Sequence, residues 1–307
     1  MPYPQNTMTK LISLTEAIQQ FVNDGDTIYA AGFTHLIPFA AGHEIIRQGK
    51  ADLVLARATP DLIYDQIVAA GCARKVIFSY MGNPGVGSLR VVRGAIEAGL
   101  LEWEEYSHFG MISRLQAGAS GLPFMPMNPT AAIDLEKANP MYRRVLDPYS
   151  GNEVVVVPAL NPDVAIVHVQ RADQAGNGQI WGIIGEQKEA AFASKRVILS
   201  AEEIVDESVI RSDPNRTLIP AFIVDAVCHV PYACHPSYTQ GYYDRDNIFY
   251  LEWDSISKSP EKIKAYLDEW VYGVQDRVEY WQKLGSEVHD RLKVNARLSK
   301  PVNYGTY

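Results

Sequence analysis

Short apolar runs and longer segments with helical spacing follow one another along the chain. Strand-like runs lie at residues 27–31, 53–56, 75–80, 102–108, 153–157, 164–170, 196–200 and 222–230. Apolar residues recur at helical spacing in residues 14–22, 38–48, 62–69, 89–98, 111–119 and 260–284. This alternation predicts an α/β fold with a layered, largely parallel sheet flanked by helices. In such sheets, ligands bind at the carboxyl ends of the strands.

Local signals mark the ends of two of these helices. Gly49 is placed to end the helix that the pattern predicts before it, because glycine readily adopts the left-handed conformation found there. Ser259 and Pro260 have the residue types favoured at an N-cap and at the first helical position. We therefore expect a helix to begin at Pro260.

One domain is expected over most of the chain. Regular periodicity lapses around residues 128–152, which predicts a long excursion or loop. The last residues are polar, and we expect them to be poorly ordered or to wrap around a neighbour. The predicted division is a single domain over residues 1–285 and a C-terminal tail over residues 286–307.

Charge and cysteine content narrow the class of protein. The chain of 307 residues has 28 Lys+Arg against 36 Asp+Glu, a formal net charge of −8. This balance argues against a general nucleic-acid or membrane-surface binder, since both need a basic surface. No apolar run approaches the roughly 18 residues of a membrane span, and we see no targeting segment. Cys72, Cys228 and Cys234 are too few for a disulfide framework, which favours a cytoplasmic location.

Two glycine-containing loops are the first candidate ligand sites. Gly32, Phe33 and Thr34 follow the strand-like run at 27–31, and Pro38 precedes a helix. A glycine at this point lets the backbone approach a ligand, and the N-terminus of the next helix favours an anion. The alternative is a plain turn between a strand and a helix.

The second loop is richer in glycine. It contains Gly82, Asn83, Gly85, Gly87 and Ser88, between a predicted strand and a predicted helix. Its N–H groups are suited to bind a phosphate or a thioester carbonyl. The loop lacks the Lys-Ser/Thr ending of a P-loop, which argues against nucleotide hydrolysis. The alternative is an ordinary flexible surface loop.

The histidine and cysteine spacings predict no metal site. His229 and His235 lie six residues apart, and so do Cys228 and Cys234. Neither spacing is typical of a zinc ligand pair. We expect these residues to belong to the core or to loops.

The motifs of the chain resemble those of a known family. The segments that carry the resemblance are GFTHLIPFA (32–40), EAGLLEWEEYSHFG (97–110), GLPFMP (121–126), PDVAIVHVQRADQAGNGQIWG (162–182), VPYACHPS (230–237), DNIFYLEWDSISKS (246–259) and WVYGVQDRVEYWQKLG (270–285). Together they resemble the A (alpha) subunits of family I CoA-transferases, most closely of the glutaconate CoA-transferase type. The resemblance implies a Rossmann-like layered sheet and covers about residues 11–285.

The resemblance also implies a function and a partner. The family transfers CoA between two carboxylic acids through a covalent glutamyl-CoA thioester, and the attacking glutamate belongs to a separate B subunit. We therefore expect a hetero-oligomer with equal numbers of A and B chains, acyl-CoA and carboxylic acid as substrates, and no cofactor beyond CoA as a substrate. Glu44, Glu97 and Glu186 lie near the motifs but are expected to be solvated or structural.

In this family the A subunit supplies walls and hydrogen-bond donors. The two glycine loops are expected to line the cleft, with the backbone at Gly32, Phe33, Gly82 and Asn83 as candidate donors to a developing oxyanion. A hydrolase or decarboxylase acting on a CoA thioester is the enzymatic alternative. A non-catalytic binding or regulatory subunit is the other alternative.

His108 is the one candidate catalytic residue in this chain. Many transferase A subunits resemble this segment but carry Gln at the matching position, and a ring-cleaving hydrolase branch carries Glu. Histidine can orient a substrate by donating a hydrogen bond, or it can transfer a proton near neutral pH. The first role fits transfer, and the second would favour hydrolysis or decarboxylation.

Overall fold

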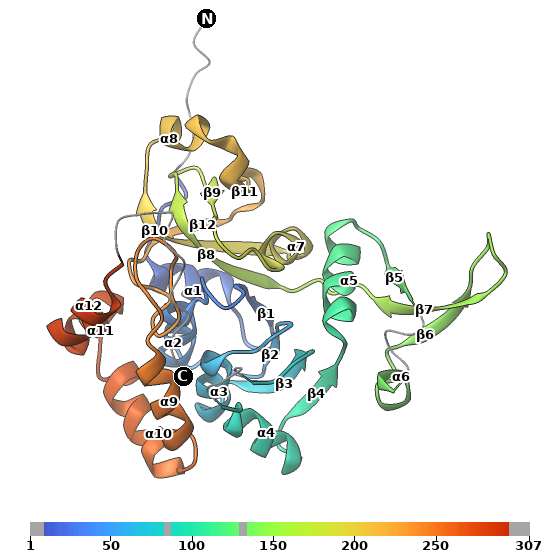
Figure 1. The fold of residues 1–307 in the computed structure, drawn as a ribbon, viewed down its shortest axis with the longest axis horizontal. Helices are drawn as coiled ribbons and strands as arrows, with labels where there is room; N and C mark the ends of the chain where they lie inside the picture. Colours follow the sequence, from blue (N-terminus) through green and yellow to red (C-terminus); the bar gives the residue numbers. More distant parts are fainter. Residues whose placement is uncertain (1–8, 83–86, 129–133, 295–307) are drawn as a thin grey trace, which may run out of the picture.

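The computed structural model describes residues 9–82, 87–128 and 134–294. In this part of the chain, a nine-stranded sheet forms the centre of the molecule (Figure 1). Its parallel strands lie in the order β12-β10-β8-β1-β2-β3-β4, and β9 and β11 add an antiparallel extension to β8. The bounds are β1 Thr27–Ala30, β2 Leu53–Ala56, β3 Ala73–Phe78, β4 Glu102–Glu105, β8 Val164–Ala172, β9 Gly178–Gln179, β10 Arg196–Ile204, β11 Thr217–Ile219 and β12 Ala226–His229. The predicted α/β class and parallel sheet are confirmed.

The sheet separates two hydrophobic clusters, because successive side chains of a strand point to opposite faces. In β8, Ile166 belongs to the first cluster, and its neighbours Ala165 and Val167 belong to the second. The first cluster receives side chains from α1 Leu14–Phe21, α2 Phe39–Arg47, α3 Leu62–Ala69, α4 Arg90–Glu97, α9 Asn247–Ile256 and α10 Pro260–Leu267. The second receives side chains from α5 His108–Ala119, α7 Gln187–Ala193 and α12 Ser286–Leu292. None of the described helices has the length and apolar character needed to cross a bilayer.

The predicted caps are present. Ser259 accepts a hydrogen bond from the N–H of Lys262 at the start of α10, with Pro260 in the first turn. Gly49 follows α2 with a φ of 63°, the left-handed conformation that ends many helices.

The segment around 128–152 is more regular than its sequence predicts. β5 Phe124–Met127, β6 Arg143–Leu146 and β7 Glu153–Pro158 form an antiparallel sheet in the order β5-β7-β6, and α6 Leu135–Ala138 lies between β5 and β6. This arm projects from the body of the molecule (Figure 1). The four residues of β6 are all exposed, so no buried face imposes the alternation that would have revealed the strand.

Three expectations near the C-terminus also change. The predicted strand at 222–230 shortens to β12, and a single helical turn occupies Ala221–Ile223. The predicted helix over 260–284 divides into α10, a π-helical turn at Asp268–Tyr272 and α11 Arg277–Leu284. The division lies at Gly273, where a Cβ would approach two main-chain carbonyl oxygens to 2.7 Å.

The segment assigned to the tail begins with a helix. α12 places Leu292 in the second hydrophobic cluster, and the expectation of poor order is therefore wrong for residues 286–292. The division of the chain into a domain and a tail stays a prediction. The remaining helix, α8 Glu207–Ser212, like α7 and α9, was not predicted from the sequence pattern.

Candidate functional site

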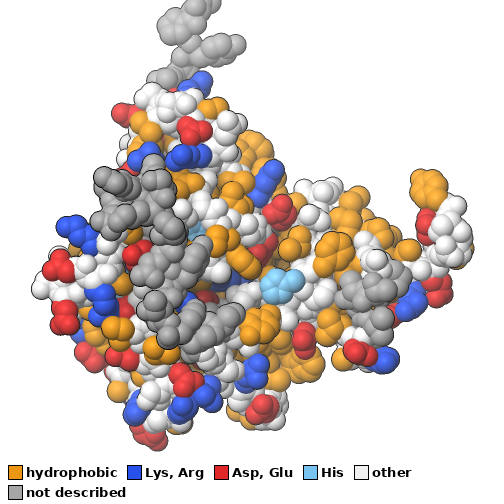
Figure 2. All heavy atoms as spheres, viewed as in Figure 1, with side chains coloured by type: hydrophobic (Ala, Val, Ile, Leu, Met, Phe, Trp, Pro, Cys, Tyr) orange, Lys and Arg blue, Asp and Glu red, His pale blue; other side chains and the backbone are white. Residues whose placement is uncertain are grey.

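Four neighbouring parallel strands end at one edge of the sheet and present polar groups there. Gly32 follows β1, Thr59 follows β2, Ser79 directly follows β3, and His108 follows β4. This is the edge at which ligands bind in parallel sheets. Figure 2 shows an exposed histidine near the centre of one face of the molecule, with hydrophobic side chains beside it.

His108 is held by two hydroxyl groups. It is the first residue of α5, whose N-cap Ser107 accepts a hydrogen bond from the N–H of Gly110. The His108 side chain is exposed, and its Nδ1 lies 2.7 Å from the Oγ of Ser79. Its Nε2 lies 2.9 Å from the Oγ1 of Thr59.

The hydrogen bonds indicate which nitrogen carries the proton. The hydroxyl of Ser79 donates to the carbonyl oxygen of Ala58 at 2.6 Å, so its Oγ is left to accept from the Nδ1–H of His108. In the neutral ring Nε2 is then the acceptor, and the hydroxyl of Thr59 donates to it. This arrangement orients the imidazole and leaves Nε2 as the nitrogen that can take up a proton. In this tautomer the single N–H of the ring is taken by Ser79, so both roles of His108 stay predictions.

Thr59 and Ser79 were not singled out from the sequence. Ser79 directly follows a predicted strand, which was a usable signal, whereas Thr59 carries no motif. Ser79 lies 29 positions before His108 in the sequence, and Thr59 lies 49 positions before it. The order of the strands in the sheet brings the three residues together.

The Gly32 loop turns sharply after β1. Gly32 has a φ of 128°, and a Cβ there would lie 2.6 Å from the carbonyl oxygen of Leu36 and 2.8 Å from that of His35. Only glycine fits this conformation and this spacing. Thr34 is exposed and Phe33 is half-buried at the tip, whereas Pro38 is buried at the N-cap of α2.

Two other segments, residues 237–238 and Ile183, fix this loop. The carbonyl of Thr34 accepts from the hydroxyl of Ser237 at 3.0 Å, and the N–H of Leu36 donates to the carbonyl of Tyr238 at 3.0 Å. His35 stacks on the ring of Tyr238, and its Nε2 lies 2.6 Å from the carbonyl oxygen of Ile183. Burial lowers the pKa of His35 to about 4, so the ring is neutral at pH 7 and donates Nε2–H to Ile183.

The second glycine loop is described only at its two ends. Asn83 and Gly85 lie outside the described residues. Gly82 has a φ of 158° and Gly87 a φ of 113°. A Cβ on Gly87 would lie 3.0 Å from the Oδ1 of Asp254 in α9. The assignment of this loop to CoA binding stays a prediction, as does that of the Gly32 loop.

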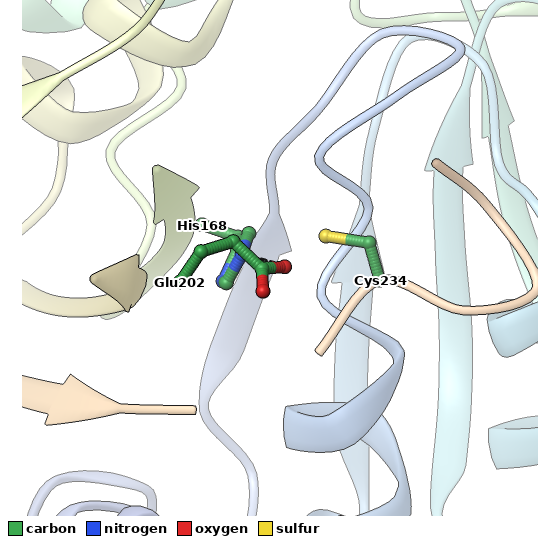
Figure 3. A group of neighbouring side chains, drawn as sticks. All are labelled: His168, Glu202 and Cys234. Carbon is green, nitrogen blue, oxygen red and sulfur yellow. Dashed lines mark hydrogen bonds and ion pairs between the residues drawn. The ribbon is translucent and has the colours of Figure 1, made fainter. Parts of the chain in front are cut away.

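A separate buried group contains residue types that bind metals. The ligand atoms of His168, Glu202 and Cys234 lie within 4.8 Å of one another, and all three residues are buried (Figure 3). The thiol of Cys234 points toward the carboxylate of Glu202 and the imidazole of His168 (Figure 3). No sequence pattern pairs His168 or Glu202 with Cys234, because the three come from β8, β10 and a loop.

Hydrogen bonds explain why these three side chains lie together, and they require no metal ion. The Oε1 of Glu202 pairs with the Nε2 of His168 at 3.0 Å and accepts from the hydroxyls of Thr239 at 3.0 Å and Tyr243 at 2.7 Å. Its Oε2 accepts from the N–H of Tyr232 at 2.7 Å. A metal at Glu202 would compete with these donors, so we assign the group a structural role. It ties the loop that fixes Gly32 to β8 and β10.

Known proteins match almost the whole chain. The coenzyme A transferase family model matches residues 11–229. The A subunit of the 3-oxoadipate CoA-transferase of Pseudomonas knackmussii is 50% identical over 280 residues, which cover 90% of this chain and 99% of the relative. The A subunit of the glutaconate CoA-transferase of Acidaminococcus fermentans is 37% identical over 305 residues, covering 94% and 95%.

A solved structure shows the same fold. The crystal structure of glutaconate coenzyme A-transferase from Acidaminococcus fermentans superimposes with a TM-score of 0.88 at 35% identity. The superposition covers 94% of this chain and 96% of that one. The chain therefore belongs to the coenzyme A transferase family, and the two relatives named above are A subunits.

Proposed function

We propose that this chain pairs with a separate B subunit, forming a complex that moves CoA between two carboxylic acids. The observation that carries the proposal is the 50% identity with the A subunit of a 3-oxoadipate CoA-transferase, which extends over 99% of that relative. The site at the carboxyl edge of the sheet supports it, because the half-buried hydroxyls of Thr59 and Ser79 and the exposed imidazole of His108 meet there.

The attacking group belongs to the partner in this proposal. A carboxylate oxygen of a B-subunit glutamate forms a bond to the thioester carbon, and the π electrons move to the carbonyl oxygen. The tetrahedral intermediate collapses with release of CoA thiolate, which then attacks the mixed anhydride at the glutamyl carbon and expels the free acid. A second carboxylic acid reverses these steps.

Of the three acidic residues near the motifs, Glu97 is exposed, whereas the other two have partners within the fold. Glu186 is buried and accepts from the hydroxyl of Tyr29 at 2.8 Å, and Glu44 pairs with Arg47. Both contacts are structural, as expected from the sequence. They support placing the nucleophile on the B subunit.

We propose that one of the two acids is a dicarboxylate related to 3-oxoadipate. The relatives at 50% and 37% identity carry the names of enzymes for 3-oxoadipate and for glutaconate. In this proposal a substrate carboxylate replaces the Nε2 of His108 as the acceptor of the Thr59 hydroxyl at this edge. CoA takes part as a substrate, and the scheme requires no other cofactor or metal. The cytoplasm is the proposed location.

The test is coexpression with a B subunit. The purified complex is expected to contain both chains in equal number and to transfer CoA only when both an acyl-CoA and an acceptor acid are present. Succinyl-CoA with 3-oxoadipate or glutaconate, followed by loss of the donor thioester and appearance of the product thioester, measures the reaction. This chain without its partner is expected to be inactive. Thioester consumption without an acceptor acid, or transfer by the single chain, would contradict the proposal.

A further inference from the structure

A buried arginine lies directly behind the Gly32 loop. Arg57 is the first residue after β2 and is 1% exposed. Its Nη2 donates to the carbonyl oxygen of Gly32 at 2.6 Å. Its Nε and Nη1 have no hydrogen-bond partner among the described residues. Among the described residues, the guanidinium therefore has one hydrogen-bond acceptor, the main-chain carbonyl of Gly32 in a candidate site loop.

This arrangement is costly for a contact that only stabilises the fold. A buried cation loses its hydration, and the loss is large unless a carboxylate or several acceptors replace the water. Among the described residues no carboxylate forms an ion pair with Arg57: the buried Glu186 accepts from Tyr29, and the buried Asp61 accepts from Tyr250 at 2.9 Å. A neutral side chain would fix the loop at lower cost.

The hydrogen bond from Arg57 determines the orientation of the Gly32–Phe33 peptide group. The only cis peptide in the described residues joins His235 and Pro236, so the Gly32–Phe33 peptide is trans and planar. In a trans peptide the C=O and the N–H point in opposite directions. Because the carbonyl of Gly32 points to Arg57, the N–H of Phe33 points away from Arg57.

We propose that Arg57 is a positioning residue for CoA transfer. It holds the Gly32–Phe33 peptide so that the N–H of Phe33 donates to the oxyanion that forms when the B-subunit glutamate attacks the thioester. Exclusion of water strengthens the hydrogen bond that a fixed N–H donates to the oxyanion. The guanidinium of Arg57 adds positive electrostatic potential behind this donor. The inference rests on the proposed function, since it assumes that this loop faces the thioester.

The decisive variant is Arg57→Met in the complex with the B subunit. We expect kcat to fall about 10²-fold, because a donor displaced by about 1 Å no longer meets the oxyanion. The KM for acyl-CoA should change by no more than about threefold, since the lost interaction forms in the transition state. Formation of the covalent B-subunit CoA thioester, followed by intact mass in a single turnover, should slow by the same factor. Arg57→Lys keeps a charged donor and should recover part of the rate.

Arg114→Met is the matched control. Arg114 is also buried, at 5% exposure, and donates to the main-chain carbonyl of Pro158 at 3.1 Å; unlike Arg57, it also pairs with a carboxylate, that of Glu104, at 3.4 Å. It should lower the melting temperature and leave the kcat of the folded complex unchanged. The inference is overturned if Arg57→Met keeps the wild-type kcat, if it raises only KM, or if Arg114→Met loses as much kcat. A wild-type complex that transfers no CoA would instead refute the proposed function.

Discussion

At the scale of single residues, His108 is held in one orientation by hydroxyl groups from two different strand ends. The Nδ1–H donates to Ser79, and an amide side chain can also donate there. We therefore expect His108→Gln to retain activity within about tenfold of wild type, the worth of one ordinary hydrogen bond. Steady-state CoA transfer by the complex measures this. A loss of about 10²–10⁴-fold would show instead that the ring transfers a proton, and unchanged rates in both His108→Gln and His108→Ala would place it outside the chemistry.

His168 makes stability depend on pH in the alkaline range. Burial opposes its protonation, but the neighbouring Cys234 and Glu202 outweigh burial and raise its pKa to about 10, against about 6.5 in the unfolded chain. The stabilisation is fully present below pH 6.5 and is lost as pH rises toward 10. Melting temperatures measured from pH 6 to 10 should fall, and the fall should be smaller in His168→Gln. Equal slopes in the two proteins would contradict this.

Two other buried histidines, His35 and His235, make stability depend on pH in the opposite sense. Burial is the main cause that lowers the pKa of His35 and of His235 to about 4. Their rings are neutral in the folded protein but protonate in the unfolded chain below pH 6.5. The same melting series extended from pH 6.5 to 4 should therefore show stability decreasing as pH falls.

At the scale of elements, the turn between β1 and α2 depends on the absence of a side chain at Gly32. A valine there would meet main-chain oxygens at 2.6 Å and 2.8 Å in a backbone conformation that β-branched residues do not adopt. We expect Gly32→Val to abolish most transfer activity, with a smaller loss of thermal stability. Turnover and melting temperature of the same preparation test this.

Gly49 provides the control for that substitution. It also has a positive φ, but a Cβ there would have no heavy atom within 4 Å. Gly49→Ala should cost about 1–2 kcal/mol of stability and leave kcat unchanged. If Gly32→Val loses folding and activity in proportion, the loop is a structural turn, as the simpler interpretation of the sequence holds.

The elements also show where sequence patterns are informative. β2 and α3 have the predicted bounds, because most of their residues are apolar and buried. β6 was missed because all four of its residues are exposed. The π-helical turn at Asp268–Tyr272 was missed because the helical periodicity continues through it.

At the scale of the whole molecule, the sequence determined the α/β class, the family and the order of most elements. Local periodicity indicates the class and the elements, and the structure confirms most of them. Motifs over about residues 11–285 indicate the family, and the family match confirms it. The motifs alone also identify Gly32 and His108 as candidate site residues. The roles assigned to these residues stay predictions.

Only the tertiary structure decided which polar groups meet. The strand order places Ser79 and Thr59 on the ring of His108, and it places Arg57 behind Gly32. It also joins His168, Glu202 and Cys234 in one buried group. These residues lie on elements far apart in sequence, and no local pattern records their contacts. The physical reason is that pairing between strands and closure of the core set such distances, whereas periodicity reports only which face of an element is buried.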